Sequence, residues 1–354
     1  MKKIVLTGGG TAGHVTPNIA LLPALREADY DVHYIGSFEG IESRLIPDFD
    51  VPYYGISTGK FRRYFDLKNF SDPFRVIKGY MEARKILKEI KPDVVFSKGG
   101  FVAVPVVRAA ADLHIPCILH ESDMTPGLAN KLCIPLANKV CCNFPETMKN
   151  LPANKAVLTG TPIRSELTKG NRIAALEACG FTSAKPVIMI VGGSQGSASI
   201  NQVVREALPR LLENYQVIHL CGKDKVDNLM LSIPGYKQFE YVKAELKDFF
   251  ALTDIVVSRA GANAICELLA LKKPNILIPL SAGSRGDQIL NAASFMEQGF
   301  SIVIKEEALD CFSLIDRIEE LMENKQRYIE NMNTSGQINA IPKIMELINE
   351  AAGN

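Results

Sequence analysis

Short apolar runs alternate with longer segments of helical periodicity from one end of the chain to the other. This alternation is typical of βαβ units and predicts parallel sheets. In the first half, strands are predicted at residues 4–6, 32–35, 53–56, 94–96, 117–119, 139–142 and 156–159, and helices at 18–28, 73–91, 102–113 and 128–136. In the second half, strands are predicted at 187–191, 217–221, 239–241, 255–258, 275–279 and 301–304, and helices at 200–213, 245–252, 263–271, 286–297 and 313–332.

The 354 residues of the chain exceed what one hydrophobic core usually organises, so this pattern predicts two domains. The best candidate for the linker is residues 160–164, Gly-Thr-Pro-Ile-Arg, which are followed by the polar residues 169–171. A last amphipathic segment, 341–352, is long enough to return to the first domain. We therefore expect an α/β protein of two Rossmann-like domains facing each other across a cleft. The first comprises residues 1–163, with 338–354 packing back on it, and the second comprises 164–337.

Composition narrows the class of protein. Apolar residues make up 47% of the chain, and no stretch of about 18 uncharged apolar residues could span a bilayer. The eight cysteines include no Cys-x-x-Cys pair, and Cys117, Cys221 and Cys266 lie within apolar runs. We therefore expect buried free thiols in a reducing, cytoplasmic environment rather than a disulfide or zinc framework.

The net charge of +1 conceals a basic segment. Residues 60–91 contain ten Lys or Arg against four acids, with aromatic residues interleaved. One interpretation is a solvated helix face whose apolar side belongs to the core. The other is a surface that meets anionic lipid headgroups, which makes the protein a peripheral membrane protein; the overall charge is too low for a nucleic-acid binder. The residues expected to face lipid are Lys60, Phe61, Arg62, Arg63, Tyr64, Phe65, Arg75 and Lys78.

Two glycine-rich loops each follow an apolar strand and open a helix. They are residues 8–14, Gly-Gly-Gly-Thr-Ala-Gly-His, and residues 192–197, Gly-Gly-Ser-Gln-Gly-Ser. Such a loop directs backbone N–H groups and the positive end of a helix at one point, which suits phosphate. Because one loop begins each half of the chain, the pair predicts two nucleotide-type domains.

The first loop also matches the Gly-x-Gly-x-x-Gly fingerprint of dinucleotide-binding oxidoreductases. That fingerprint requires an acid at the end of the second strand to hold the ribose hydroxyls. The second strand here ends in Ile35-Gly36-Ser37, and the nearest acid, Glu39, lies beyond the turn. This argues against an oxidoreductase, and the missing Gly-Lys-Ser/Thr ending argues against a P-loop NTPase.

The second half holds further polar groups at strand ends. Glu267 follows the strand 255–258 and the small-residue turn Arg259-Ala260-Gly261, at a distance that suits hydrogen bonds from two ribose hydroxyls. Asp287 and Gln288 begin the helix after the next strand, and an acid beside an amide suits recognition of sugar hydroxyls. For Asp287 taken alone, a helix N-terminal acid is the simpler interpretation.

With these motifs the chain resembles the GT-B glycosyltransferases, and within them family 28, the lipid-linked N-acetylglucosaminyltransferases of bacterial cell-wall synthesis. The resemblance covers residues 8 to about 299. The motifs that carry it, in order along the chain, are residues 9–15, 97–102 (Ser-Lys-Gly-Gly-Phe-Val), 120–123 (His-Glu-Ser-Asp) with 127–131, 160–164, 192–196, 259–261 with 267, and 287–288 with 291–292.

The resemblance implies transfer of N-acetylglucosamine from UDP-N-acetylglucosamine to the muramyl sugar of lipid I, with inversion, on the cytoplasmic side of the cell membrane. It implies no cofactor, and cell-wall and division machinery as partners. It further implies that the residues binding the substrates are Thr11, Ala12, Gly13, Asp123, Arg164, Ser194, Gln195, Val242, Ala262, Asn263, Ala264, Glu267, Asp287 and Gln288.

Three positions depart from the family pattern. Ala12 stands where many relatives have glycine, Ser122-Asp123 where many have Gln-Asn, and Thr161 where many have asparagine. Asp123 therefore offers an acceptor in place of an amide donor.

The chemistry requires a general base and a means of stabilising the leaving diphosphate. His14 follows the first glycine loop, on the half that does not hold the donor, and is the predicted base; Glu121 and Asp123 are the alternatives. Helix N-termini and Arg164 can stabilise the diphosphate, so no metal is implied. The Asp-x-Asp sequence at residues 48–50 is interpreted as a solvated turn.

Two other enzyme classes remain open. One is a GT-B transferase with a different sugar nucleotide or lipid acceptor. The other is a UDP-sugar 2-epimerase of similar fold, which would need no lipid surface.

Overall fold

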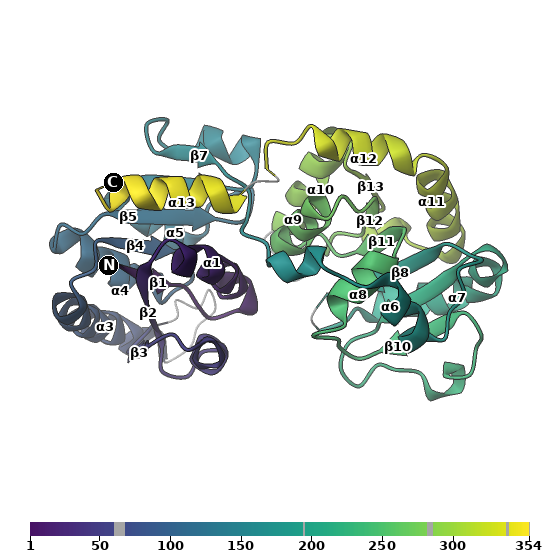
Figure 1. Ribbon diagram of the computed structural model, residues 1–354, viewed down its shortest axis with the longest axis horizontal. Helices are drawn as coiled ribbons and strands as arrows, with labels where there is room; N and C mark the ends of the chain where they lie inside the picture. Colours follow the sequence, from purple (N-terminus) through teal and green to yellow (C-terminus); the bar gives the residue numbers. More distant parts are fainter. Residues whose placement is uncertain (60–67, 194, 282–285, 338–339, 354) are drawn as a thin grey trace. The chain divides into compact units, whose positions relative to one another are not determined.

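The computed structural model describes residues 1–59, 68–193, 195–281, 286–337 and 340–353, and the side chains of residues 68–73 are not described. The chain divides into two compact units (Figure 1). Unit 1 comprises Met1–Arg164 and Gly336–Asn354, and unit 2 comprises Ser165–Ser335. The boundaries expected from the sequence lie within two residues of these. The predicted membrane residues 60–65 and the predicted donor residue Ser194 lie outside the described residues.

Unit 1 is built on a seven-stranded sheet in which every described pair of strands is parallel. The strand order is β3-β2-β1-β4-β5-β6-β7. The order reverses direction between β1 and β4, so the loops that follow these two strands lie at the switch point where α/β sheets bind ligands. The strands are β1 (Lys2–Thr7), β2 (Tyr30–Ser37), β3 (Tyr53–Ile56), β4 (Val94–Ser97), β5 (Cys117–Glu121), β6 (Lys139–Cys142) and β7 (Ala156–Leu158).

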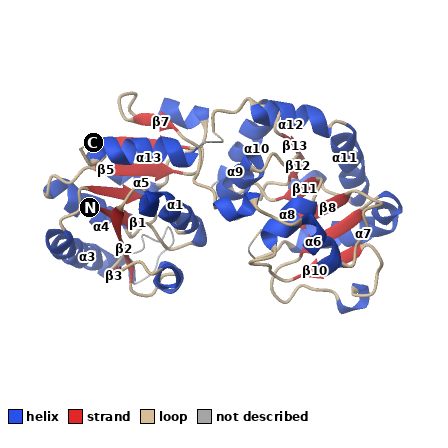
Figure 2. Cartoon of the chain, in the orientation of Figure 1, coloured by secondary structure: helices blue, strands red, loops and turns tan. Residues whose placement is uncertain are grey.

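Helices cover both faces of this sheet because its strands are apolar on both sides (Figure 2). Ile4 of β1 packs in a core cluster with residues of α1 and α13, whereas its neighbour Val5 packs in a second cluster with α3 and α4. The C-terminal helix α13 therefore belongs to unit 1, where Ile344 and Ile348 are fully buried. The helices are α1 (Thr16–Glu27), α2 (Glu42–Leu45), α3 (Lys68–Ile90), α4 (Ala103–Asp112), α5 (Leu128–Cys133) and α13 (Ala340–Ala351).

Unit 2 repeats the architecture on a six-stranded parallel sheet of order β10-β9-β8-β11-β12-β13, with its switch point between β8 and β11. The strands are β8 (Val187–Val191), β9 (Gln216–Leu220), β10 (Tyr236–Phe239), β11 (Ile255–Ser258), β12 (Asn275–Leu277) and β13 (Ser301–Val303). The helices are α6 (Arg172–Cys179), α7 (Ala198–Asn214), α8 (Leu246–Leu252), α9 (Ala262–Ala270), α10 (Asp287–Glu297), α11 (Cys311–Glu323) and α12 (Lys325–Asn333).

The structure corrects four local predictions. The helix predicted at 313–332 is two helices, because Asn324 ends α11 and its side chain donates to the Glu320 carbonyl (2.8 Å). Helix α6 was missed because Asn171, interpreted as linker, is its N-cap and accepts from two backbone N–H groups. The helix predicted at 128–136 ends at Cys133, where a short 3₁₀ turn begins with Pro135 in its first turn. The strand predicted at 239–241 is β10, which ends at Phe239.

Candidate functional site

The first glycine loop is hydrogen-bonded to a buried carboxylate, that of Glu42, which lies at the start of α2. Its two oxygens accept hydrogen bonds from the backbone N–H of Gly10 (3.0 Å) and of Ser37 (3.1 Å), and from the Ser37 hydroxyl (2.5 Å). A Cβ atom on Gly9 would lie 2.3 Å from this carboxylate, so glycine is required there. Glu42 therefore fixes the shape of the loop that leads to His14.

The environment of Glu42 also argues against a dinucleotide-binding oxidoreductase. In dinucleotide-binding domains the acid after the second strand holds the ribose hydroxyls. Here Glu42, five residues after β2, is fully buried and accepts hydrogen bonds from the loop after β1 and from Ser37 at the end of β2. The sequence analysis missed this residue, because nothing in the spacing between positions 10 and 42 reveals the contact.

His14 ends the 3₁₀ turn Ala12–His14, directly before α1. Its Nδ1 lies 3.0 Å from the Thr11 hydroxyl, so that a residue of the same loop orients the ring. The imidazole is half-buried, at the edge of unit 1 where the strands end. This position leaves the ring able to meet a substrate bound at the switch point.

The two alternative bases occupy different environments. Glu121, at the end of β5, is buried and accepts from the N–H groups of Asp123 and Gly127 (both 3.0 Å) and from Asn130 Nδ2 (2.8 Å). Burial raises the pKa of the Glu121 carboxyl, and these hydrogen bonds oppose the rise. Its geometry is that of a carboxylate that shapes the loop after β5, whereas Asp123 is half-buried on that loop.

In unit 2, the second glycine loop leads from β8 into α7. Gly196 passes so close to the loop after β9 that a Cβ atom would lie 1.9 Å from the Cys221 carbonyl oxygen. The Gln195 carbonyl accepts from Lys225 Nζ (2.7 Å), and Ser197 caps the helix. Residues after β9 therefore hold this loop in place. The loop leads to the N-terminus of α7, which lies at the end of strand β8.

Arg259 and Glu306 form an ion pair that joins the segments after four strands of unit 2, β8, β11, β12 and β13. The Arg259 guanidinium donates to Glu306 and to the Ser197 hydroxyl (2.8 Å), while Glu306 Oε2 accepts from the N–H (3.2 Å) and hydroxyl (3.0 Å) of Ser281. Burial alone would raise the pKa of the Glu306 carboxyl, but hydrogen bonds from Arg259, Ser281 and Ser199 outweigh burial and lower this pKa to about 2. Glu306 thus holds a cation beside the second glycine loop, a role the sequence analysis did not assign.

The ion pair predicts a pH-dependent contribution to stability. The pKa of Glu306 is lower in the folded chain than its ordinary value of 4.5, so its stabilisation is complete above pH 4.5 and is lost as pH falls toward 2. Glu306→Gln should lower the free energy of unfolding most at about pH 6, and the gap from wild type should narrow by about pH 3. Urea unfolding at both pH values measures this; a gap that does not change with pH would contradict the ion pair.

A mostly apolar cavity of about 200 Å³ lies where β8, β9 and β11 end. Three residues predicted to bind substrate, Val242, Ala264 and Glu267, line it, and Ala262 and Asn263 begin α9 at its side. Glu267 thus places a carboxylate in apolar surroundings, where an unpaired polar ligand group would be costly. The lining residues are Val191, Gly193, Leu220, Glu240, Tyr241, Val242, Leu246, Phe250, Val256, Ser258, Ala264, Glu267 and Leu268.

Asp287 and Gln288 begin α10 after Gly286, whose φ of +82° favours glycine. The amide oxygen of Gln288 accepts from the Leu280 N–H (3.0 Å), which fixes the orientation of the amide. Asn291 Nδ2 donates to the Ala260 carbonyl (3.3 Å) and ties α10 to the turn before α9. Apart from Ser194, which lies outside the described residues, the predicted donor residues of unit 2 follow strand ends at one edge of its parallel sheet.

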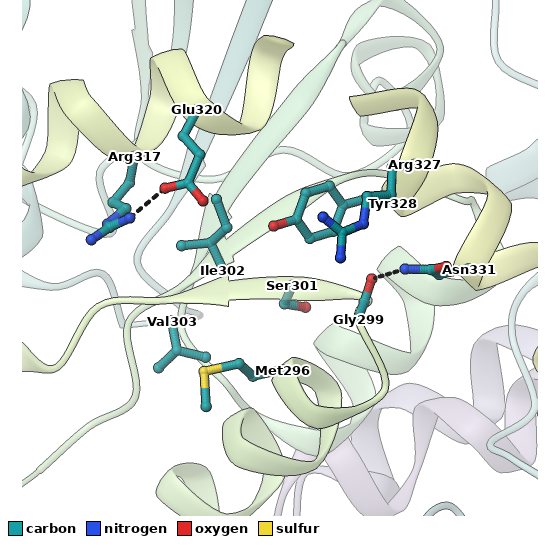
Figure 3. Close-up of a pocket in the computed structure, with 10 residues that line it drawn as sticks. All are labelled: Met296, Gly299, Ser301, Ile302, Val303, Arg317, Glu320, Arg327, Tyr328 and Asn331. Carbon is teal, nitrogen blue, oxygen red and sulfur yellow. Dashed lines mark hydrogen bonds and ion pairs between the residues drawn. The ribbon is translucent and has the colours of Figure 1, made fainter. Parts of the chain in front are cut away.

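A larger cavity, of about 370 Å³, lies along β13 between α10, α11 and α12 (Figure 3). Three of its polar side chains pair with neighbours: Arg317 with Glu320, and Asn331 with the Gly299 carbonyl (3.0 Å). None of the predicted substrate residues lines it, so volume alone does not identify the site. Its lining consists of Met296, Gly299, Ser301, Ile302, Val303, Arg317, Glu320, Arg327, Tyr328 and Asn331.

Within the described ranges, no group of three or more His, Cys, Asp or Glu side chains gathers as metal ligands would. The Asp48-Phe49-Asp50 sequence lies at a 3₁₀ turn that ends with Asp50 in the left-handed region (φ 54°). The predicted stabilisers of the leaving diphosphate are helix N-termini and arginine. Arg164, predicted to serve there, is the last residue of unit 1.

Comparison with known proteins places both halves of the chain in one family. Residues 4–142 match the glycosyltransferase family 28 N-terminal domain, and residues 187–348 match the family's C-terminal domain. A protein of Lachnoclostridium phytofermentans is 64% identical over 351 residues, which cover 99% of each chain. A Clostridium botulinum protein is 57% identical over 349 residues, 98% of this chain and 99% of the relative. Both are named UDP-N-acetylglucosamine–N-acetylmuramyl-(pentapeptide) pyrophosphoryl-undecaprenol N-acetylglucosamine transferase.

Solved structures bear on the fold. The crystal structure of Acinetobacter baumannii MurG matches with a TM-score of 0.79 at 24% identity, over 99% of this chain and 100% of that one. A Listeria monocytogenes protein described as a putative UDP-N-acetylglucosamine 2-epimerase matches with a TM-score of 0.72 at 13% identity, over 99% of this chain and 96% of that one. Transferases and epimerases thus share this architecture, and the fold class predicted from the sequence is confirmed.

Proposed function

Since the chain belongs to glycosyltransferase family 28, we propose that it transfers N-acetylglucosamine from UDP-N-acetylglucosamine to N-acetylmuramyl-(pentapeptide) pyrophosphoryl-undecaprenol, lipid I. The acceptor is the C4 hydroxyl of the muramyl sugar, and the product is lipid II, a precursor of peptidoglycan. The observation that carries this function is the 64% identity to a transferase of that name over 99% of both chains.

The donor is assigned to unit 2. The nucleoside occupies the cavity at the ends of β8, β9 and β11, where Glu267 accepts hydrogen bonds from the two ribose hydroxyls. The diphosphate lies at the N-termini of α7 and α9, and Arg259, fixed by Glu306, adds a cation there. Gln288 and Asp287 read the sugar hydroxyls. These groups stabilise the charge that develops on UDP as it leaves.

The acceptor is assigned to unit 1. In an inverting transfer, the acceptor hydroxyl attacks the anomeric carbon from the face opposite UDP, and a base takes its proton while the bond to UDP breaks. His14 is the proposed base. Glu42 fixes the loop that carries His14, and the Thr11 hydroxyl orients its ring. Glu121 and Asp123 shape the neighbouring acceptor loop, and Asp123 remains the alternative base.

Docking to an anionic membrane surface is assigned to α3. This helix buries Ala83 and Leu87 fully, yet its other face exposes Phe74 (74%), Ile77 (56%) and Met81 (58%). Arg75, Lys78 and Lys85 are exposed on the same helix, so basic and apolar groups share one surface. An apolar stripe flanked by lysine and arginine suits binding to the anionic membrane in which a lipid acceptor lies. Among the described residues, no helix combines the length and apolar composition needed to cross a bilayer.

Docking of this kind predicts salt-sensitive binding to vesicles. Binding to vesicles of phosphatidylglycerol should exceed binding to neutral phosphatidylcholine, and should weaken as salt rises from about 0.1 to about 0.5 M. The double variant Phe74→Ser, Ile77→Ser should bind several-fold more weakly in co-sedimentation. Ile173→Ser is the matched control, because Ile173 is equally exposed (66%) but lies on α6 of unit 2. Equal binding to both vesicle types at every salt concentration would argue against this surface.

Substrate dependence separates the proposed transferase from an epimerase of the same fold. With purified enzyme, UDP release from UDP-N-acetylglucosamine should require lipid I, and no UDP-sugar epimer should form. An epimer formed without lipid acceptor would instead favour the epimerase class. Transfer to another lipid acceptor, such as diacylglycerol, would favour a different transferase.

A further inference from the structure

Lys98 is a buried lysine at the switch point of unit 1. It is the first residue after β4, its N–H donates to the Thr7 carbonyl (2.9 Å), and only 1% of it is exposed. A Cβ atom on Gly8 would lie 3.2 Å from the Lys98 Cβ, so the lysine packs directly under the first glycine loop. Because a buried ammonium is costly unless it is hydrogen-bonded, its partners indicate its role.

The ammonium has acceptors on two other segments of the chain, the end of β5 with its following loop and the segment after β7. Lys98 Nζ lies 2.7 Å from His120 Nδ1, 2.5 Å from Ser122 Oγ and 3.2 Å from Thr161 Oγ1. His120 and Ser122 belong to the segment that carries Glu121 and Asp123, and Thr161 belongs to the segment after β7 that ends unit 1. One side chain therefore joins the ends of β4, β5 and β7.

These contacts fix the state of the His120 ring. A lysine ammonium only donates, so His120 Nδ1 must accept, and the ring proton must lie on Nε2. Nε2–H then donates to the Gly160 carbonyl (2.8 Å). The ring is completely buried, and burial together with the charge of Lys98 holds the pKa of His120 well below its usual value. His120 is thus a neutral bridge between Lys98 and the backbone after β7.

We propose that Lys98 is a positioning residue for the transfer reaction: its ammonium locks neutral His120 in the Nε2–H form and clamps the acceptor loop of residues 121–127. This inference rests on the proposed function, because the loop matters only if an acceptor binds there. Lys98 contacts the loop through Ser122, one residue before Asp123, and through His120, one residue before Glu121. Loss of the ammonium releases both contacts and leaves the donor groups of unit 2 untouched.

The test uses Lys98→Met, which keeps the length of the side chain and removes its charge and donors. Nitrogen-15 NMR of the imidazoles should show wild-type His120 neutral at pH 7 with its proton on Nε2, and protonated only at a lower pH than an ordinary histidine. In Lys98→Met, His120 should titrate at higher pH, because the cation that lowers its pKa is gone. Turnover should fall about 100-fold with lipid I, as expected when a loop shifts by about 1 Å, while affinity for UDP-N-acetylglucosamine stays unchanged. Lys149→Met, which removes an exposed lysine of unit 1, is the matched control.

Several results would overturn the inference. A wild-type His120 with its proton on Nδ1, or one that titrates like an exposed histidine, would contradict the assigned network even if Lys98→Met fails to fold. An unchanged His120 titration in a folded Lys98→Met variant would do the same. A wild-type enzyme that does not transfer to lipid I would refute the proposed function instead, while the NMR measurement still reports on the network.

Discussion

Replacing His14 by alanine is expected to lower turnover by about 100- to 10,000-fold, the range that a general base contributes. Affinity for UDP-N-acetylglucosamine should remain at the wild-type value, because His14 lies in unit 1 and the assigned donor groups lie in unit 2. The loss should therefore appear in kcat rather than in the KM for the donor. Steady-state kinetics with lipid I, together with calorimetry of donor binding, measures both quantities.

Asp123→Ala is the decisive companion to this variant, since Asp123 is the alternative base. Near-normal turnover in His14→Ala with a large loss in Asp123→Ala would assign the base to the aspartate. His114→Asn serves as the control for removal of a histidine. It replaces an exposed histidine of unit 1 whose φ of +59° asparagine tolerates.

Glu267→Ala is expected to weaken donor binding by about 1–3 kcal/mol, or about 5- to 150-fold, because the ribose hydroxyls lose their acceptor in an apolar cavity. Glu240→Ala is a matched control, since Glu240 lines the same cavity but is exposed and accepts from the Asp224 N–H (3.1 Å). Calorimetry with UDP-N-acetylglucosamine should show a small change for Glu240→Ala. A loss in Glu240→Ala with wild-type affinity in Glu267→Ala would move the ribose to the other carboxylate.

Much of the fold could be predicted because parallel strands buried on both faces form continuous apolar runs. The runs around Ile4 and Val187 are examples, and the glycines after each mark the tight turn into a helix. The same logic brought Glu267, Asp287 and Gln288 to one sheet edge, since the ends of parallel strands share an edge. Local boundaries were less predictable, because side-chain caps such as Asn171 and Asn324 decide them.

The supports of the site could not be predicted. Glu42, Lys98 and Glu306 contact loops that are distant in sequence, and no local pattern distinguishes them from solvated charges. The structure does give two departures from the family pattern a physical reason. Ser122 and Thr161 place small hydroxyl acceptors beside the Lys98 ammonium. Side-chain contacts between loops that are distant in sequence can be predicted only when the order of the strands in the sheet is known.

The most direct test of the central claim is the structure of the lipid formed by the purified enzyme from UDP-N-acetylglucosamine and lipid I, with its mass measured by mass spectrometry and its linkage by NMR. The account predicts one product that is heavier than lipid I by a single N-acetylglucosamine residue, with a β linkage to the C4 hydroxyl of the muramyl sugar. Lipid I recovered unchanged while the nucleotide sugar is converted to an epimer, or a product with an α linkage, would contradict it.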